Sequence, residues 1–261
     1  MSDGAPPESI AAPGPSYRPC IVIPYYRHEG AIADTIRRLK PFGLSCWIVD
    51  DGSGDSSRQV LQDIAQREAS WVRVHGYAGN RGKGEAVMTG CARARAEGFT
   101  HAVQIDADGQ HDSDDLPRML SLSRMQPEAL VTGIPVYDES VPKARLYGRY
   151  LTHVCVWIET LSFRIRDSMC GFRVYPLDQA LDIWNEGRVG RRMDFDTGIM
   201  VRMFWRGVPV LSLPTRVTYP ADGVSHFRML RDNVRLTWMH LRLLAGMCLR
   251  SPWLLWRRLQ S

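Results

Sequence analysis

The stretch Ala102-Val103-Gln104-Ile105-Asp106-Ala107-Asp108-Gly109-Gln110-His111 decides the fold, because a mostly apolar run ends abruptly in two carboxylates. The apolar run is typical of a buried strand, and the polar residues after it are typical of a loop. Two carboxylates one residue apart at a strand end can both approach a hard divalent cation, which prefers oxygen ligands. The alternative is a plain strand-to-loop turn, where Asp is common. Three segments upstream, described below, favour a cation site over a plain turn.

Short apolar runs alternate with helix-like segments along the first half of the chain. Strands are predicted near residues 20–23, 46–49, 71–75, 102–105 and 129–132, and helices near 30–39, 56–67, 82–97 and from 117 onward. This alternation predicts an α/β fold with a Rossmann-like, mostly parallel central sheet that helices cover on both faces. The second half is less regular, with helices expected at 144–163 and 193–206, a turn followed by a strand at 168–175, and a strand at 208–213.

Several polar residues follow directly after predicted strands. They are Pro24, Asp50, Asn80 and Asp106. Because ligands bind parallel sheets at the carboxyl ends of the strands, we expect these residues to converge on one edge. The carboxylates of Asp50 and Asp51 can accept hydrogen bonds from ribose hydroxyls or a base N–H. The alternative for this segment is a polar turn that leads into the next helix.

The segment Asn80-Arg81-Gly82-Lys83-Gly84 opens a predicted helix. Glycines, a helix N-terminus and a lysine together can form a phosphate cradle. The segment is not a Walker loop, because Gly follows the Lys where Ser or Thr is required. The alternative is a helix-start loop with an exposed lysine, and the residues alone do not decide between the two.

Taken together, these segments resemble the family 2 glycosyltransferases of the GT-A fold. Across roughly residues 18–225 the chain is closest to the branch of dolichyl- or polyprenyl-phosphate sugar synthases. The matching residues are Pro24-Tyr25-Tyr26 with Glu29, Val49-Asp50-Asp51-Gly52-Ser53, Asn80 with Gly82-Lys83-Gly84, Asp106 to His111, and Asp167 with Cys170-Gly171-Phe172-Arg173. The resemblance implies inverting, metal-dependent transfer of a sugar from a UDP- or GDP-linked donor to a lipid or lipid-linked acceptor.

The resemblance also implies roles for individual residues. The nucleotide would be bound by Pro24, Tyr25, Glu29, Asp50, Asp51, Lys83 and Asp106. The metal, Mg²⁺ or Mn²⁺, would be held by Asp106, Asp108 and Gln110. Asp196 is the first candidate for a catalytic base and Asp167 the second, although carboxylates at a helix start are often caps. An acceptor that is already a phosphate would need no strong base.

The acceptor side departs from the family pattern. The branch usually carries Gly-Ser-Arg after the strand at 129–132, whereas this chain has Gly133-Ile134-Pro135. A basic residue that would meet the acceptor phosphate is therefore missing there. We expect Arg145 or Arg149, or the nearby Lys143, to compensate, together with Arg173.

Composition limits the class of protein. Residues 1–17 are rich in Pro, Gly, Ala and Ser, and we expect a disordered lead-in without a signal-peptide pattern. Six dispersed cysteines indicate a reducing compartment without a disulfide framework. The net charge of +5 is concentrated in residues 226–261, which hold seven Arg and one Asp.

The segment 226–261 reads as a basic amphipathic helical tail. One helical face gathers apolar residues, and the neighbouring strip gathers arginines, until Pro252 is expected to break the helix. The apolar face consists of Phe227, Leu230, Val234, Trp238, Leu241, Leu244 and Cys248. This pattern predicts a peripheral anchor on an anionic membrane, at the cytoplasmic inner face. The alternative is a helix that packs on the catalytic core. We expect no membrane-spanning helix and no nucleic-acid partner.

Two other functions compete with sugar transfer. A sugar-phosphate nucleotidyltransferase would carry a Gly-rich phosphate loop directly after the first strand, and Ile23-Pro24-Tyr25-Tyr26-Arg27 is not one. A non-catalytic nucleotide-binding scaffold at the membrane would have no need of the complete set Asp106, Asp108 and Gln110.

Overall fold

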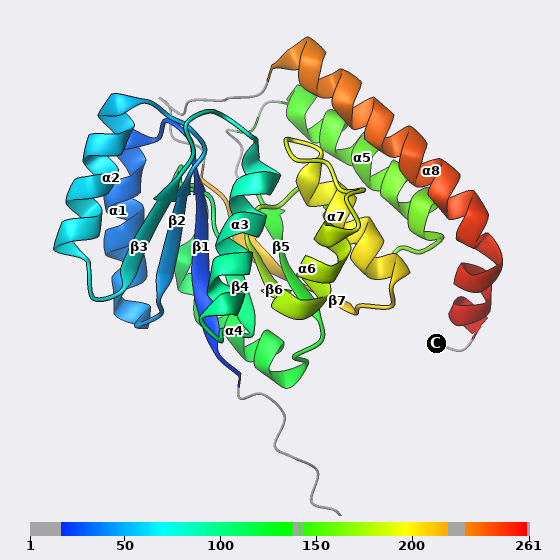
Figure 1. Cartoon of the computed structure of the whole chain (residues 1–261). Coiled ribbons are helices and arrows are strands. Elements are labelled where there is room, and N and C mark those ends of the chain that lie inside the picture. The colour runs from blue at the N-terminus through cyan, green and yellow to red at the C-terminus, as the bar shows by residue number, and fades with distance from the viewer. Residues whose placement is uncertain (1–16, 138–140, 142, 219–227, 260–261) are drawn as a thin grey trace, which may run out of the picture.

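The computed structural model describes residues 17–137, 141, 143–218 and 228–259, so the predicted lead-in lies almost entirely outside the described residues. Seven strands form one sheet in the order β3-β2-β1-β4-β6-β5-β7 (Figure 1). The strands are β1 (Pro19–Tyr25), β2 (Cys46–Asp50), β3 (Val72–Gly76), β4 (His101–Gln104), β5 (Leu130–Val136), β6 (Arg173–Pro176) and β7 (Val210–Arg216). Neighbouring strands run parallel except β6, which is antiparallel to β4 and β5. The mostly parallel sheet predicted from the sequence is confirmed.

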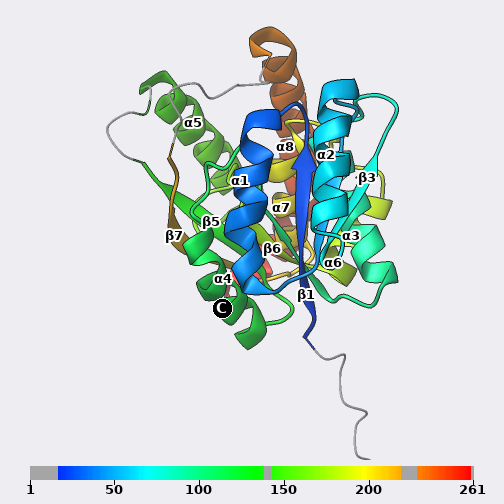
Figure 2. The same ribbon diagram turned by 90° about the vertical axis from the view of Figure 1, so that its left-hand side faces the viewer.

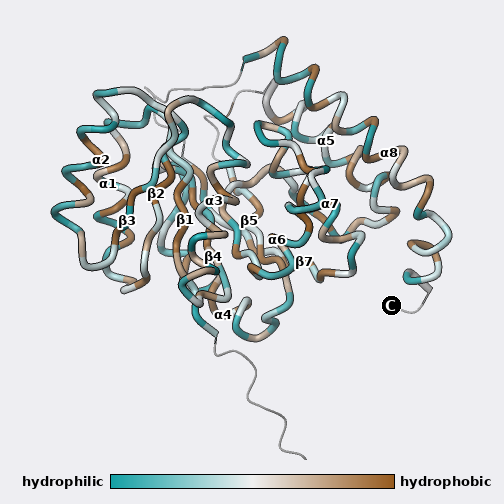
Figure 3. Tube along the Cα trace, viewed as in Figure 1, coloured by the Kyte–Doolittle hydropathy of each residue, from teal (hydrophilic) through white to brown (hydrophobic). Residues whose placement is uncertain are grey.

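Helices cover both faces of this sheet, as the edge-on view in Figure 2 shows. One face carries α1 (Glu29–Leu39), α2 (Asp55–Arg67) and α4 (Leu116–Met125), and the other carries α3 (Lys83–Ala96), α6 (Leu177–Asn185) and α7 (Phe195–Trp205). Short 3₁₀ turns at Lys40–Phe42 and Ser113–Asp115 complete the connections. Figure 3 shows the hydrophobic residues concentrated along the strands between these layers.

The strand β1 shows why the sheet is covered twice. Ile21 and Ile23 pack into the core cluster on the α1 side, whereas Cys20 and Val22 pack into the cluster on the α3 side. Successive side chains of a strand point to opposite faces, so a strand that is apolar at every position requires a helix layer on each face. Because β1 runs parallel to both β2 and β4, the carboxyl ends of these three strands meet at one edge of the sheet, where the polar loops lie.

Two long helices lie side by side against α7, namely α5 (Lys143–Thr160) and α8 (Met229–Leu259) (Figure 1). Met239, Leu243 and Leu254 of α8 are buried in the core. His240 Nδ1 of α8 lies 2.7 Å from Glu159 Oε1 of α5. Within the described residues, no helix is both long enough and apolar enough to span a membrane.

The structure corrects the sequence prediction at two places. Helix α6 was not predicted, and α8 continues through Pro252 instead of breaking there. A proline lacks the N–H that would bond the carbonyl four residues earlier, here that of Cys248. The Ser251 hydroxyl donates to that same carbonyl oxygen at 2.9 Å, which replaces the lost bond.

Candidate active site

Lys83 is the centre of the polar edge. It is the first residue of α3, and its ammonium lies 2.9 Å from Asp106 Oδ1 and 3.0 Å from Asp196 Oδ2. Asp106 follows β4, and Asp196 lies in the first turn of α7. The fold thus brings together three residues that are far apart in the sequence. With Asp108, two residues beyond Asp106, we call them the acidic cluster.

Burial and charge oppose each other in this cluster. Burial alone would lower the pKa of Lys83, but the carboxylates of Asp106 and Asp196 outweigh it and raise that pKa above its usual value. Burial alone would raise the pKa of Asp106, but the Lys83 ammonium and the neighbouring His111 hold it well below the ordinary range. Lys83 and Asp106 are therefore a tightly paired ammonium and carboxylate.

Asp108 differs from its two acidic neighbours. Burial and the nearby Asp106 carboxylate raise the pKa of Asp108 above its ordinary value. No Lys or Arg among the described residues is within ion-pair distance of its carboxylate. The loop that carries it is fixed by three hydrogen bonds: Gln110 N to Asp108 Oδ1 (3.1 Å), Arg38 Nη2 to Gly109 O (3.1 Å) and Thr218 N to Gln110 O (3.0 Å). These bonds hold in place a carboxylate with which no Lys or Arg of the described residues pairs, and the charges of His111 and His28 offset only part of the rise in its pKa.

The residues of this loop fit a divalent cation. Asp108 and Gln110 offer oxygen donors, and a cation would relieve the cost of the ionised Asp108. In the part of the chain that the structure describes, no group of three or more His, Cys, Asp or Glu residues is arranged to hold a metal alone. The remaining ligands would have to come from water or from a phosphorylated ligand, as is usual for Mg²⁺ sites.

Gly171 allows the carboxylate of Asp106 to sit where it does. A Cβ built on Gly171 would lie 2.3 Å from Asp106 Oδ2, so only glycine leaves room for the carboxylate. The turn at Cys170-Gly171-Phe172-Arg173 therefore packs against the loop after β4. This contact joins two of the segments on which the sequence resemblance rests.

The acids after β2 bond to neighbouring loops. Asp51 accepts hydrogen bonds from Arg81 N (2.6 Å) and Gly82 N (2.8 and 3.0 Å). Asp50 Oδ1 accepts from the N–H and hydroxyl of Ser53 at 3.0 and 2.5 Å. Both carboxylates are almost fully buried. In this structure they shape the loops at the end of β2, which matches the alternative interpretation of a polar turn.

The predicted phosphate cradle at the start of α3 is already filled. The carbonyl oxygen of Arg191 accepts from Gly84 N at 2.9 Å and from Glu85 N at 3.4 Å. Gly82 has φ 111°, and a Cβ there would lie 2.2 Å from the same oxygen. Because the helix N-terminus is capped by the chain itself, its amides are not available to a phosphate.

The residues at the end of β1 lie deeper than the resemblance implies. Pro24 and Tyr25 are buried. Glu29, in the first turn of α1, accepts hydrogen bonds from Ser56 Oγ at 3.2 Å and from Ser57 Oγ. Of these three, only Glu29 is partly exposed at the edge of the sheet.

Asp167 belongs to a second group, which we call the clamp cluster: Arg149, His153 and Asp167. Arg149 donates to Asp167 through Nε at 2.5 Å and Nη2 at 2.7 Å, and His153 Nε2 lies 3.2 Å from Asp167 Oδ2. The N–H groups of Met169 and Cys170 donate to Asp167 Oδ1. Burial would raise the pKa of Asp167, but the hydrogen bond from His153 and the charge of Arg149 hold it well below the ordinary value.

These contacts correct two expectations. An Asp with a depressed pKa and five hydrogen-bonding contacts is a poor proton acceptor, so Asp167 does not fit the role of base. Arg149 is bound to Asp167 through two of its nitrogens, so this pairing competes with its expected role at an acceptor phosphate.

Arg173 is also placed differently from the prediction. Its side chain is fully buried, and it donates to Cys170 O (2.7 Å), Ser168 O (2.6 Å) and Asp196 O (2.6 Å). A guanidinium that is enclosed in this way cannot touch an acceptor. Arg145 lies in the first turn of α5, and its side chain is outside the described residues.

Sequence reasoning missed the polar residues beneath the acidic cluster. Gln104 and Tyr175 are fully buried, and Gln104 Nε2 donates to Asp196 Oδ1 at 3.2 Å. The signal was a single polar residue in the apolar run Ala102-Val103-Gln104-Ile105. A buried amide requires hydrogen-bond partners, so its presence in a core strand indicates a network.

Comparison with known proteins places this geometry in a family. The sequence profile of glycosyl transferase family 2 matches residues 20–180. The chain is 25% identical over 241 residues to polyprenol monophosphomannose synthase of Mycolicibacterium smegmatis, with 87% of each chain covered. It is 28% identical over 258 residues to dolichyl-phosphate beta-glucosyltransferase of Homo sapiens, with 93% of this chain and 78% of the relative covered.

Solved structures agree on the fold. Glucosyl-3-phosphoglycerate synthase from Mycobacterium tuberculosis, crystallised with Mn²⁺ and UDP-glucose, superposes with a TM-score of 0.64 at 16% identity. The match covers 89% of this chain and 79% of that chain. The GT-A fold predicted from the sequence is confirmed.

Proposed function

This chain belongs to glycosyl transferase family 2 and is a glycosyltransferase, and from that premise we propose that it transfers a sugar from a UDP- or GDP-linked donor to a polyprenyl- or dolichyl-type phosphate. The observation that carries the proposal is Asp108, a half-buried carboxylate at the carboxyl ends of parallel strands, with which no Lys or Arg of the described residues forms an ion pair. Because the members of this family are glycosyltransferases, sugar transfer is favoured over a non-catalytic scaffold and over a sugar-phosphate nucleotidyltransferase.

The donor would bind at the edge formed by the loops after β1, β2 and β4. Glu29 and the loops held by Asp50 and Asp51 would surround the nucleoside, and Asp108 and Gln110 would hold Mg²⁺ or Mn²⁺. The cation, when bound, offsets the charge that develops on the departing nucleoside diphosphate. Support for a metal comes from the fit of the oxygen donors and from the fold relative that was crystallised with Mn²⁺ and UDP-glucose.

The transfer would invert the anomeric configuration in a single displacement. The acceptor oxygen attacks the anomeric carbon, and the bond to the nucleoside diphosphate breaks. A phosphate acceptor needs no strong base, so a carboxylate would only have to take the proton that remains on an acceptor phosphate arriving singly protonated. We favour Asp196 for this role, because it belongs to the acidic cluster whereas Asp167 is enclosed in the clamp cluster. Lys83 would hold both Asp196 and Asp106 in place.

The acceptor class follows from the relatives, two of which act on polyprenol or dolichyl phosphates by name. A lipid acceptor requires a surface that meets the membrane. On α8, the apolar residues from Leu230 to Cys248 that the sequence placed on one face are exposed, with Leu230 at 83% and Trp238 at 59%, whereas Phe227 of that predicted face lies outside the described residues. On the adjacent α5, Tyr147 and Leu151 are exposed at 74% and 65%. Monomeric soluble proteins rarely expose apolar residues in such numbers together.

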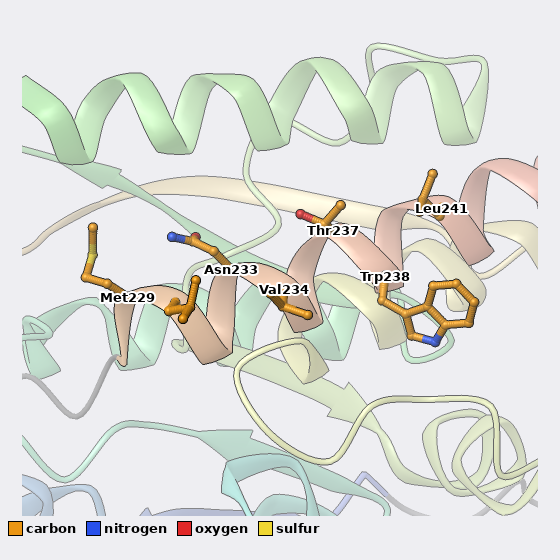
Figure 4. Close-up of a pocket in the computed structure, with 7 residues that line it drawn as sticks. Met229, Asn233, Val234, Thr237, Trp238 and Leu241 are labelled. Carbon is orange, nitrogen blue, oxygen red and sulfur yellow. The ribbon is translucent and has the colours of Figure 1, made fainter.

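The exposed side of α8 carries both features of an interfacial helix. A shallow, open surface along it is lined mostly by apolar side chains, among them Met229, Val234, Trp238 and Leu241 (Figure 4). Arg231 and Arg242 are exposed on the neighbouring strip. An apolar face beside arginines suits the peripheral contact with an anionic membrane that we propose. The opposite face of α8 packs on the core, so the proposed membrane contact concerns only the exposed face of the helix.

Membrane contact is tested with two exposed positions. Replacing Trp238 and Leu241 with Gln removes apolar surface without touching the core face of α8. We expect partition of the full chain into anionic vesicles to fall at least tenfold, because each buried large side chain contributes roughly 1.5–3 kcal/mol. Met125→Gln, at the exposed end of α4, is the matched control. Equal partition of both variants and the unmodified chain would remove the membrane proposal.

Transfer is tested directly with radiolabelled UDP- and GDP-sugars and a short polyprenyl phosphate, with Mn²⁺ or with chelator. We expect one donor to label the lipid only when metal is present, and the product to have the inverted anomeric configuration by NMR. Equal labelling in chelator would contradict the metal, and retained configuration would contradict the single displacement. No labelling with any donor would contradict the lipid-phosphate acceptor.

A further inference from the structure

Beneath the acidic cluster, four side chains form one chain of hydrogen bonds. Arg173 Nη1 lies 3.3 Å from Tyr175 Oη, Tyr175 Oη lies 3.2 Å from Gln104 Oε1, and Gln104 Nε2 lies 3.2 Å from Asp196 Oδ1. Arg173, Tyr175 and Gln104 are fully buried, and Asp196 is the only member with measurable exposure, at 7%. The chain thus runs from the interior of the sheet to the active site.

The chemistry of the donors fixes the direction of every bond. A guanidinium only donates, so the hydroxyl of Tyr175 must accept from Arg173 and send its own proton to Gln104 Oε1. The amide oxygen of Gln104 is then the acceptor, and its NH₂ group faces Asp196 Oδ1. Lys83 binds the other oxygen of Asp196 at 3.0 Å. Each oxygen of that carboxylate therefore has its own donor.

We propose that Gln104 is a positioning residue, which holds the carboxylate of Asp196 in one orientation for proton transfer. Tyr175 and Arg173 lock the amide of Gln104 in the donating orientation. The inference rests on the proposed function, because it concerns the base of that reaction. It assigns a role to Arg173, whose enclosed guanidinium also donates to the backbone carbonyl of Asp196 at 2.6 Å.

A purely structural network would not need to end at this carboxylate. Apolar residues of similar volume stabilise a core at least as well as a buried polar network, so a Met in place of Gln104 would serve packing alone. In this network the last donor, Gln104 Nε2, instead binds a side chain of the active site, the carboxylate of Asp196. Without that donor, Asp196 Oδ1 keeps only the longer ion pair with Arg173 Nη1 at 3.9 Å, and the orientation of the carboxylate is less restricted.

The test compares Gln104→Met and Tyr175→Phe with Tyr17→Phe in the full chain. Tyr17→Phe is the control, because its hydroxyl donates to Leu120 O at the opposite end of the sheet. We expect Gln104→Met to lower kcat roughly tenfold, the effect of ~1.4 kcal/mol, while KM for the donor stays within about twofold. We expect a smaller loss of kcat in Tyr175→Phe, and no change in the control.

The unfolding midpoint separates positioning from stability. A merely structural role would lower the midpoint of thermal unfolding and leave kcat of the folded protein unchanged, whereas loss of positioning lowers kcat at temperatures well below that midpoint. The double variant Gln104→Met/Tyr175→Phe should be no slower than Gln104→Met, because the two residues act in series. An unchanged kcat in folded Gln104→Met, or additive losses, would overturn the inference alone, whereas an inactive unmodified chain would overturn the proposed function with it.

Discussion

The acidic cluster and the clamp cluster both bury carboxylates, yet only one of them balances its charge. In the clamp cluster, Asp167 has two bonds from Arg149, a contact with His153 and two backbone donors. In the acidic cluster, Lys83 pairs with Asp106 and Asp196, and Asp108 is left over. A balanced cluster holds segments together, and an unbalanced one has a place for a ligand of opposite charge.

The pKa values record the same difference. Asp167 is depressed because its partners outweigh the cost of burial, and Asp108 is raised because burial and the Asp106 carboxylate act in the same direction. A carboxylate with a raised pKa at the edge of a parallel sheet is a candidate for a functional role. The comparison therefore supports our proposal that a metal and diphosphate bind at the loop after β4, and not at the turn at 167–173.

Removing the unbalanced charge should have the largest effect on activity. We expect Asp108→Ala to lower metal-dependent turnover by about 10³-fold or more, because a lost metal contact costs several kcal/mol of transition-state stabilisation. The measurement is the initial rate of sugar transfer at saturating donor. Asp114→Ala, an exposed acid a few residues later, serves as the control and should keep the unmodified rate. Equal rates in Asp108→Ala and Asp114→Ala would contradict the assignment of a functional role to the acidic cluster.

Removing the balanced charge should instead act on stability. Asp167→Asn leaves the Arg149 guanidinium buried without its counter-charge, and breaking such a pair costs about 3–5 kcal/mol. Urea unfolding followed by circular dichroism measures this loss. Asp63→Asn, on the exposed side of α2, is the matched control. A loss below about 1 kcal/mol would show that the clamp cluster does not hold the turn.

Neutralising Asp108 should change stability in the direction opposite to neutralising Asp167. A raised pKa means that the ionised carboxylate costs folding free energy above that pKa, and that the cost disappears at low pH. Asp108→Asn should therefore raise the unfolding midpoint of the metal-free protein by about 2 °C at pH 7, with no gain near pH 3. Differential scanning calorimetry in chelator checks the sign. A lowered midpoint at pH 7 would mean that Asp108 is already compensated.

The sequence was sufficient to predict the fold, and it also pointed to the loop after β4 as a candidate site. Strand and helix periodicity are local signals, and the pairing of Asp106 with Asp108 at a strand end is visible in ten residues. The partners of these acids were not predictable. Lys83 meets Asp196 only because α3 and α7 lie on the same face of the sheet, which no local pattern encodes.

Arg173 and α8 show where prediction from the sequence failed because tertiary packing decides the outcome. Arg173 was assigned to the acceptor by its place in a motif, but burial decides its role, and burial depends on the packing of β6 between β4 and β5. On α8, periodicity located an apolar face, and the structure shows that the core is contacted by a different one. A single sequence does not specify which of two apolar faces meets the core, because both satisfy the same helical period.

Calorimetric titration of UDP and GDP into the full chain, with and without Mn²⁺ and in parallel with Asp108→Ala, tests the unbalanced charge most directly. We predict that one nucleotide binds only when Mn²⁺ is present and that the binding is lost in Asp108→Ala, whose fold is checked by circular dichroism. Binding of the nucleotide with equal affinity in chelator, or in the folded Asp108→Ala variant, would contradict the assignment of this carboxylate to the metal and diphosphate.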